Sequence, residues 1–317
     1  MLQFGYRSTG APDGERSPGE RWLPYSPIIR RPKLAWPGGA RLALWICPNV
    51  LHYESDPPAD PLLEAWPRMP QPDVMAFGRQ DFAARVGFWR VLEVLDRFPV
   101  RCTAVVNSAA LLTQPDVCAA ARERRWGMLG HGICNTRFVH ALSESQERTY
   151  WRMMREQVQR AVGVELIGTG GPGPQSATVR TMDLLAEEGF LWHGDWFCDD
   201  QPVPLRVRSG RMISLPYAQD TNDAPFLGTA FECDDFVDVV RRQFDRLYRE
   251  GADSGRVMCI SIHPALIGQA HRIGHLQALL EYVCGFPDVW HATGDEIARH
   301  YLAHFDEAVR ASIGEAP

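Results

Sequence analysis

The stretch that decides the fold class is RLALWICPNV, residues 41–50. It is an almost continuous apolar run, which is typical of a strand buried on both faces of a parallel sheet. Similar short apolar runs follow at 101–107, 126–130, 165–169, 190–196, 212–216, 256–263 and 288–290. Segments with helical periodicity separate most of them: 81–98, 115–125, 143–163, 176–189, 234–251, 275–285 and 294–302. This alternation predicts an α/β fold with a parallel sheet and right-handed crossovers. About seven such units favour a closed, irregular barrel, with an open doubly wound sheet as the alternative.

The composition is that of a folded globular protein. Of the 317 residues, 45% are hydrophobic and 23% are charged. These values exclude a disordered chain, a collagen, a coiled coil and a small disulfide scaffold. The formal net charge of -6 gives no electrostatic support for binding to nucleic acid or to an acidic membrane. We therefore expect a small-molecule substrate, and neither nucleic acid nor membrane as a partner.

The chain divides into three parts. Residues 1–21 are rich in Gly, Pro, Ser and Arg and are expected to form a flexible arm. Residues 22–305 are expected to form a single barrel domain, which includes a long proline-rich loop over 55–79, and residues 306–317 a C-terminal tail. In the segment 22–39 and in the proline-rich loop, apolar side chains exceed what a monomer surface needs, so we expect a homo-oligomer.

Cysteine usage and the N-terminal residues bear on location. The eight cysteines form no CxxC pair and mostly stand inside apolar runs, as buried thiols of a reducing compartment do. The N-terminus has no apolar segment typical of a secretory signal, and no run approaches the about 18–20 residues of a membrane span. We expect a cytoplasmic protein.

Polar side chains gather where the predicted strands end, which is where parallel α/β proteins place their active sites. An Asp after a strand is often only the N-cap of the next helix or part of a turn, and a lone His is often structural. The convergence of several strand ends is therefore the signal. The candidates are Asn49, Glu54, His131, Asn135, Asp195, Trp196, Asp199, Asp200, Asp220, Asn222, Asp223 and His263.

Two histidines stand out because each directly follows an apolar strand. His131 ends WGMLG and His263 ends RVMCISI. Imidazole titrates near neutrality, so the pair could provide a general base and a general acid, and the two rings should then lie close together. The sequence has no dinucleotide fingerprint after a strand, no P-loop and no nucleophile elbow. It also lacks HExxH, and Asn135 rather than a second histidine stands four residues after His131, so no metal site is expected there from these motifs.

From about Trp22 to Tyr301 the chain resembles the polysaccharide deacetylase (NodB-homology) superfamily, in the branch related to metal-independent allantoinase and cyclic-imide hydrolases. The matching stretches are RLALWICPNV, RVGFWRVLEVLDRF, LGHGICNTRF, GGPGP, LLAEEGF with GDWFCDDQP, ISLPYAQDTND, IHPALIGQAHRIGHLQALLEYV and VWHATGDEIARHY. The resemblance implies a deformed (β/α)7 barrel and a hydrolase of carbon–nitrogen bonds other than peptide bonds.

The resemblance also implies roles for single residues. Typical deacetylases of the superfamily hold zinc or another divalent ion with an Asp after the first strand and an HxxxH pair. Here Asn49 and Asn135 stand at two of these three positions, and His131 matches the first histidine. His263 matches a histidine that acts near the leaving group. Relatives in the allantoinase-like branch have a carboxylate where this chain has Leu51.

These matches lead to a reaction hypothesis. Water attacks the carbonyl carbon of a small cyclic ureide, imide or amide, with His131 or His263 as base and acid. Asn49 and Asn135 would stabilise the oxyanion, and Asp195, Asp199 or Asp223 would orient a histidine or bind substrate N–H groups. No cofactor is expected, although a weakly bound zinc at His131 is left open.

Two alternatives follow from the same residues. One is a metal-dependent N-deacetylase of an acetamido sugar or polysaccharide in carbohydrate metabolism, with Glu54, His131 and an Asp as ligands. The other is a catalytically silent binding protein of the same fold, for which the missing carboxylate at Leu51 is the support.

Overall fold

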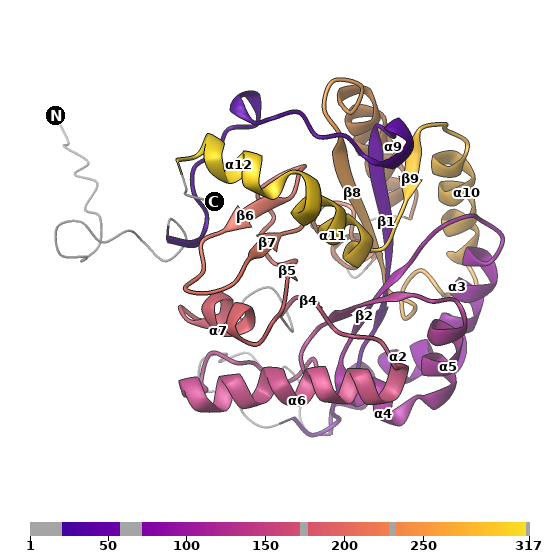
Figure 1. Ribbon diagram of the computed structural model, residues 1–317. Coiled ribbons are helices and arrows are strands. Elements are labelled where there is room, and N and C mark those ends of the chain that lie inside the picture. Colours follow the sequence, from indigo (N-terminus) through magenta and orange to yellow (C-terminus); the bar gives the residue numbers. More distant parts are fainter. Residues whose placement is uncertain (1–20, 58–71, 172–176, 228–232, 315–317) are drawn as a thin grey trace, which may run out of the picture.

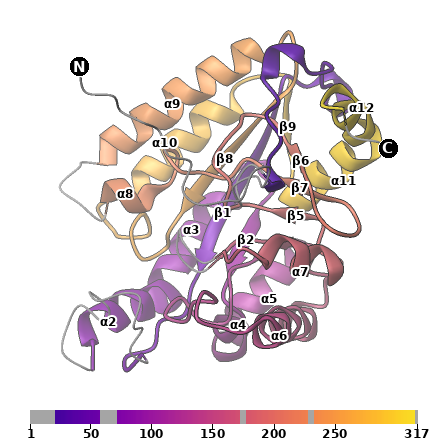
Figure 2. The ribbon, with the colours of Figure 1, turned by 90° about the vertical axis from the view of Figure 1, so that its left-hand side faces the viewer.

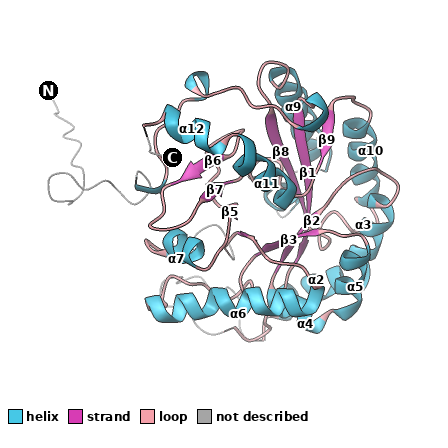
Figure 3. Ribbon diagram, viewed as in Figure 1, coloured by secondary structure: helices cyan, strands magenta, loops and turns pink. Residues whose placement is uncertain are grey.

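We describe the protein from a computed structural model, which places residues 21–57, 72–171, 177–227 and 233–314. One curled sheet has helices on its outer face (Figures 1 and 3). The strands are β1 Leu42–Val50, β2 Thr103–Val106, β3 Gly127–Gly130, β4 Gly168–Thr169, β5 Trp192–His193, β6 Val203–Leu205, β7 Met212–Ser214, β8 Arg256–Ile262 and β9 Val289–His291.

The sheet has the strand order β6-β7-β5-β4-β3-β2-β1-β8, and β9 also pairs with β1. All ladders are parallel except the one between β6 and β7. Irregular segments cover the free edge of β8: Val257 N–H donates to the Asp200 carbonyl at 2.8 Å, and Ser261 N–H donates to the Thr221 carbonyl at 3.0 Å. The predicted deformed barrel is thus confirmed. Strands form only part of its wall, and irregular segments form the rest.

Helices surround the sheet (Figure 2). They are α2 Val74–Phe82, α3 Phe88–Leu95, α4 Ser108–Thr113, α5 Pro115–Glu123, α6 Glu144–Val162, α7 Thr181–Glu187, α8 Asp223–Leu227, α9 Cys233–Glu250, α10 Ile273–Cys284, α11 Gly294–His304 and α12 Asp306–Ser312. Two short 3₁₀ turns, Ile28–Arg30 and Pro37–Gly39, precede β1, and a π-helical turn, Ala83–Gly87, joins α2 to α3. Helices α9, α10 and α3 pack side by side, as do α5, α6 and α7.

Strand β1 shows why its sequence is apolar throughout. Successive side chains of a strand point to opposite faces. Leu42, Leu44 and Ile46 belong to the core between sheet and helices, whereas Trp45 and Cys47 belong to a second core inside the curled sheet. Both faces are therefore buried. The inner row continues past Cys47 to Asn49 and Leu51, at the carboxyl end of the strand.

The amino ends of the strands are covered by α11. The Gly294 N–H donates to Thr103 Oγ1 at 2.8 Å, beside the start of β2. The Trp192 indole N–H, inside the barrel, donates to Asp295 Oδ1 at 2.8 Å. Thr293 caps this helix in a capping box with Glu296. Because this end is sealed, the carboxyl ends are where polar groups can meet solvent.

Three local predictions need correction. Residues 74–79, expected in a loop, begin α2; the rest of that loop, residues 58–71, lies outside the described residues. Helix α4 was not predicted, because SAALLT is too short to show a helical period. The antiparallel β6 was also missed, and Pro202 and Pro204 explain why it lies at the sheet edge: proline cannot donate a ladder hydrogen bond.

The chain ends pack on this barrel. In the segment before β1, Trp22, Leu34 and Trp36 are buried, whereas Tyr25 and Ile29 are 87% and 88% exposed. Residue Val309 of α12 belongs to the inner core, although it lies in the predicted tail. The homo-oligomer and the domain limits stay predictions. No helix among the described residues has the length and apolar character needed to cross a membrane.

Candidate active site

A cavity of about 400 Å³ opens at the carboxyl ends of the strands. Asn49 is near the end of β1, His131 follows β3, Asp195 lies two residues after β5, and His263 follows β8. All four line this cavity, so the structure places the two predicted histidines on one face of the barrel. Asn135 and Asn222 line it as well. The other lining residues are Leu51, Tyr53, Gly171, Phe197, Tyr217, Ala218, Gln219, Ala224 and Pro225.

His263 forms a dyad with Asp223, the first residue of α8. Its Nδ1 lies 2.6 Å from Asp223 Oδ1, and its backbone N–H donates to both carboxylate oxygens at 2.9 and 3.0 Å. The Asp223 side chain is fully buried, and that of His263 is 15% exposed. A carboxylate only accepts when ionised, so Nδ1 carries the proton in this contact. Nε2, on the opposite side of the ring, is left for the cavity.

His131 is held in a different state. Burial disfavours its charged form and lowers its pKa to about 4, although the Asp195 carboxylate opposes this shift. His263 nearby lowers the pKa further, while contacts with the Asn135 amide and the Gly170 carbonyl raise it. At neutral pH His131 is therefore an uncharged imidazole. The two histidines of the cavity thus differ in their surroundings. His263 is paired with a carboxylate, whereas burial is the main influence on His131.

Asp195, which lines the cavity, is held by two neighbours. Its Oδ2 accepts from the Gly171 N–H at 2.8 Å and lies 3.1 Å from His193 Nε2. The other ring nitrogen of His193 lies 2.9 Å from Thr169 Oγ1. A Cβ on Gly170 would stand 3.0 Å from Asp195 Oδ1, so the absent side chain lets the carboxylate approach the backbone. His193 was missed from sequence because it is the buried end of a strand, as any core residue could be.

Asn49 is tied to β8. Its Nδ2 donates to Ser261 Oγ at 2.8 Å, to the Ile262 carbonyl at 3.1 Å and to the Cys47 carbonyl at 3.3 Å. Ser261 Oγ lies 2.8 Å from the Tyr217 hydroxyl, and burial is the main cause that raises the pKa of Tyr217 well above its usual value. Sequence reasoning missed Ser261 and Tyr217, since one is inside a strand and the other in a turn.

Asn135 also lines this cavity. Its Nδ2 donates to the Tyr53 hydroxyl, and its backbone N–H donates to the His52 carbonyl at 2.9 Å. Its Oδ1 is buried and makes no well-formed hydrogen bond among the described residues, although it lies close enough to the His131 ring to raise the pKa of that histidine. This oxygen can therefore still accept from a ligand.

Several predicted site residues lie elsewhere. Glu54 turns away from the cavity: it accepts from Thr136 Oγ1 at 2.7 Å and pairs with Arg137 at 2.6 Å, which lowers its pKa. Trp196 faces the outer core, where its ring packs edge-on against Trp22 at 6.0 Å. Both were expected to bind substrate. Each directly follows a residue that lines the cavity, Tyr53 or Asp195, but its own side chain does not line it.

The remaining aspartates line a neighbouring cavity. Asp199, Asp200 and Asp220 border a separate space of about 300 Å³ behind Phe197 and Tyr217. Asp199 is paired with Arg31. Burial raises the pKa of Asp200, and the adjacent Asp199 raises it further. These three are therefore not beside the histidines. Asn222 does line the cavity that contains the two histidines, and its Oδ1 accepts from the Ala224 N–H at 3.0 Å at the start of α8.

The side chains around His131 do not fit zinc. Asn49 and Asn135 are neutral amides, Leu51 is apolar, and Glu54 points away. In the described residues, no group of three or more His, Cys, Asp or Glu side chains is placed to hold a metal ion. Zinc in proteins takes imidazole, thiolate or carboxylate ligands. This donor set therefore disagrees with the zinc centre that typical deacetylases of the superfamily would imply.

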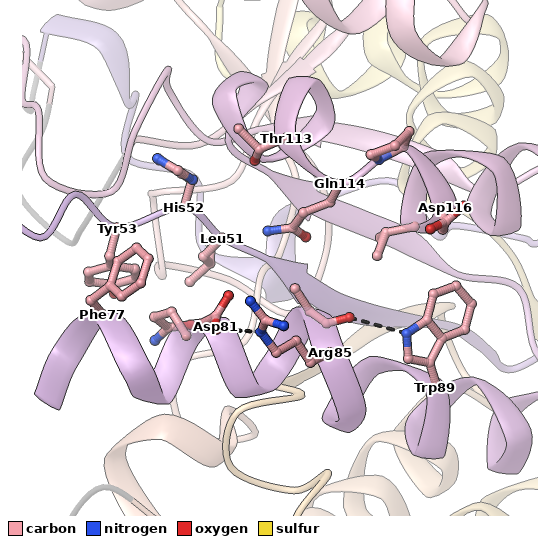
Figure 4. Close-up of a pocket in the computed structure, with 14 residues that line it drawn as sticks. Leu51, His52, Tyr53, Phe77, Asp81, Arg85, Trp89, Thr113, Gln114 and Asp116 are labelled. Carbon is pink, nitrogen blue, oxygen red and sulfur yellow. Dashed lines mark hydrogen bonds and ion pairs between the residues drawn. The ribbon is translucent and has the colours of Figure 1, made fainter. Parts of the chain in front are cut away.

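A larger cavity of about 690 Å³ adjoins the first one. It lies between α2 and the junction of α4 and α5, and Leu51 and Tyr53 line both cavities (Figure 4). Its charged side chains include Asp81 and Arg85, which pair with each other along one helix. It does not bring together ionisable groups from several strand ends. The smaller cavity is therefore the candidate active site.

Comparison with known proteins agrees with this geometry. A protein of Schizosaccharomyces pombe named "Putative polysaccharide deacetylase" is 25% identical over 303 residues, which cover 84% of this chain and 92% of that protein. The crystal structure of Puue allantoinase matches with a TM-score of 0.74 and 27% identity, covering 86% of this chain and 94% of the other. The chain resembles the allantoinase-like polysaccharide deacetylases.

A further solved structure supports the same resemblance. The crystal structure of a "probable Polysaccharide deacetylase from Pseudomonas aeruginosa PAO1" has a TM-score of 0.74 and 26% identity, and covers 86% of this chain and 95% of that one. No protein-family model matches the chain. The similarity to allantoinase-like polysaccharide deacetylases extends over most of the barrel in sequence and structure.

Proposed function

We propose that the protein hydrolyses a carbon–nitrogen bond, other than a peptide bond, in a small cyclic ureide, imide or amide. The observation that carries this proposal is the His263–Asp223 dyad in the same cavity as an uncharged His131. The similarity to Puue allantoinase and to polysaccharide deacetylases favours the same reaction class. A cavity of about 400 Å³ suits a small substrate.

The dyad supplies the proton transfers. A water molecule attacks the substrate carbonyl carbon, and His263 Nε2 takes the proton that the water loses. Asp223 stabilises the imidazolium that forms, as a buried carboxylate does in other histidine dyads. When the tetrahedral intermediate collapses, the carbon–nitrogen bond breaks and His263 returns the proton to the leaving nitrogen. An imide or ureide nitrogen leaves more readily than an alkyl amine.

Other residues bind and orient the substrate. The Oδ1 of Asn222 accepts from the Ala224 N–H, so its amide N–H₂ group is free to donate to the developing oxyanion. Uncharged His131 and Asp195 also line the cavity, where they can position the water or the substrate. Asn49 and Asn135 were expected from sequence to stabilise the oxyanion. Their N–H₂ groups donate to protein atoms, so each can offer only its oxygen atom to a substrate.

The decisive experiment is turnover of a panel of substrates. Hydantoin, dihydrouracil and succinimide represent cyclic ureides and imides, and N-acetylglucosamine and its oligomers represent acetamido sugars. We expect ring opening of at least one cyclic compound and no release of acetate. Acetate release from the sugars would favour the deacetylase alternative. Absence of turnover, with binding of a cyclic compound, would favour the silent binding protein.

We expect this activity to be independent of a bound metal. The protein, purified without added metal, should contain far less than one zinc per chain by elemental analysis, because the amides near His131 are poor zinc ligands. Turnover should be the same before and after exhaustive chelation. A matched assay of a zinc-dependent hydrolase should lose activity under the same treatment. Activity that is lost to chelator and restored by a divalent ion would overturn the metal-free reaction.

A further inference from the structure

We propose that Asn49 is a specificity-determining residue that reads a substrate N–H, and that Ser261 and Tyr217 are its positioning residues. This inference rests on the proposed function and deepens it. It narrows the substrate class to cyclic ureides and imides with an unsubstituted N–H beside the carbonyl group that water attacks.

The orientation of the Asn49 amide is fixed by what its nitrogen faces. Two of its three partners are the backbone carbonyls of Cys47 and Ile262, which can only accept. The amide group must therefore turn its N–H₂ toward β8. The reversed orientation would place Oδ1 against two carbonyl oxygens and leave the third contact to Ser261 alone.

Ser261 and Tyr217 reinforce this orientation from the side. The Ser261 hydroxyl bridges Asn49 Nδ2 and the Tyr217 hydroxyl, with both contacts at 2.8 Å. Burial keeps the Tyr217 phenol protonated at neutral pH, since it raises the pKa well above the usual value. Asn49 itself is 5% exposed, on a strand paired with β8 over seven residues from Leu42 to Pro48. The amide is thus preorganised before a ligand arrives.

The consequence is that Asn49 offers Oδ1, an acceptor, to the ligand. No group of the described residues donates to this atom. An acceptor cannot stabilise an oxyanion, but it can bind a substrate N–H. Asn135 Oδ1 is a second buried acceptor, and the Asp195 carboxylate adds a third in the same cavity. This excess of acceptors matches a ligand with several N–H groups.

Cyclic ureides have this chemistry. In a five- or six-membered ureide ring, N–H groups flank the carbonyl carbons, so one ring can satisfy Asn49 and a second acceptor while water attacks. A substrate methylated at these nitrogens has the same carbonyl groups but leaves the buried acceptors unpaired. Sites built to hydrogen-bond a substrate group discriminate strongly against an analogue that lacks it.

The test compares hydantoin with 1,3-dimethylhydantoin, and succinimide with N-methylsuccinimide. We expect the wild-type kcat/KM to be at least tenfold, and up to about 100-fold, higher for each N–H compound. Asn49→Leu should lower kcat/KM for the N–H compounds much more than kcat/KM for the methylated ones, so the ratio approaches one. Ser261→Ala should reduce the ratio in part, mainly through KM, while the fold is retained.

The outcomes separate this inference from the proposed function. Equal turnover of each pair by the wild type would overturn the inference and leave the function standing. If no compound is turned over, the function fails, and calorimetric binding of hydantoin against dimethylhydantoin then decides the inference. Preferential binding of hydantoin that Asn49→Leu abolishes would support it; equal binding or none would overturn it. Should Asn49→Leu not fold, Ser261→Ala and Tyr217→Phe give the same comparison.

Discussion

Replacing Asp223 by Asn is expected to lower kcat by about 10³- to 10⁴-fold in a protein that still folds. The carboxylate now accepts from the Nδ1–H of His263 at 2.6 Å. The oxygen of an amide would accept from the backbone N–H of His263, and its N–H₂ would turn toward the ring Nδ1, because two donors cannot face each other. The ring would then keep its proton on Nε2, where the reaction needs a free lone pair. The substitution keeps the size of the side chain, so packing around α8 should change little.

The measurement is kcat on the best substrate of the panel, with the melting temperature as a check of folding. Asp234→Asn is the matched control, because Asp234 also pairs with a histidine, His275 Nε2 at 3.1 Å, but at an exposed site outside the cavity. The control should retain wild-type activity. An Asp223→Asn protein within tenfold of the wild-type kcat, and equally stable, would remove the dyad from the mechanism.

The sequence predicted the parts of this site that depend on strand ends. His131 and His263 each follow an apolar run, and parallel topology brings such ends together. The alternation along β1 likewise accounts for the inner position of Asn49. These features are local in sequence and follow from the geometry of a strand. They could be predicted without knowledge of the neighbours.

The parts that failed depend on contacts between distant segments. Asp223 precedes His263 by 40 positions, so the sequence could name it only as one of three aspartates that would orient a histidine, and could not say which histidine. For Asn49 the sequence could not decide between donor and acceptor, because an amide can be either and only the carbonyls of Cys47 and Ile262 fix its orientation. Glu54 pairs with Arg137, 83 residues away in sequence, and does not line the cavity. Side-chain partners, rather than strand positions, limited the prediction.

The pH dependence of stability should report the state of His131. Its pKa is about 4 in the folded protein and 6.5 in an exposed chain, because burial disfavours the charged form. Between these values the unfolded chain binds more protons than the folded one. The contribution of the uncharged His131 ring to the free energy of unfolding is therefore fully present above about pH 6.5 and is lost as the pH falls toward 4. The loss attributable to this group is about 3 kcal/mol by pH 4.

His131→Gln removes the titrating ring, so the free energy of unfolding of this variant should fall less than that of the wild type between pH 7 and pH 4. Subtracting the two curves cancels the other ionisable groups, which both proteins share. The control is His271→Gln, at an exposed histidine, whose curve should run parallel to the wild type. Denaturant unfolding at several pH values gives the free energies. A His131→Gln curve parallel to the wild type would mean that His131 binds its proton as readily when folded, and that the Asp195 carboxylate fully offsets the effect of burial. His131 would then be an imidazolium at mildly acidic pH, and the cavity would hold a cation where the proposed reaction places an uncharged ring.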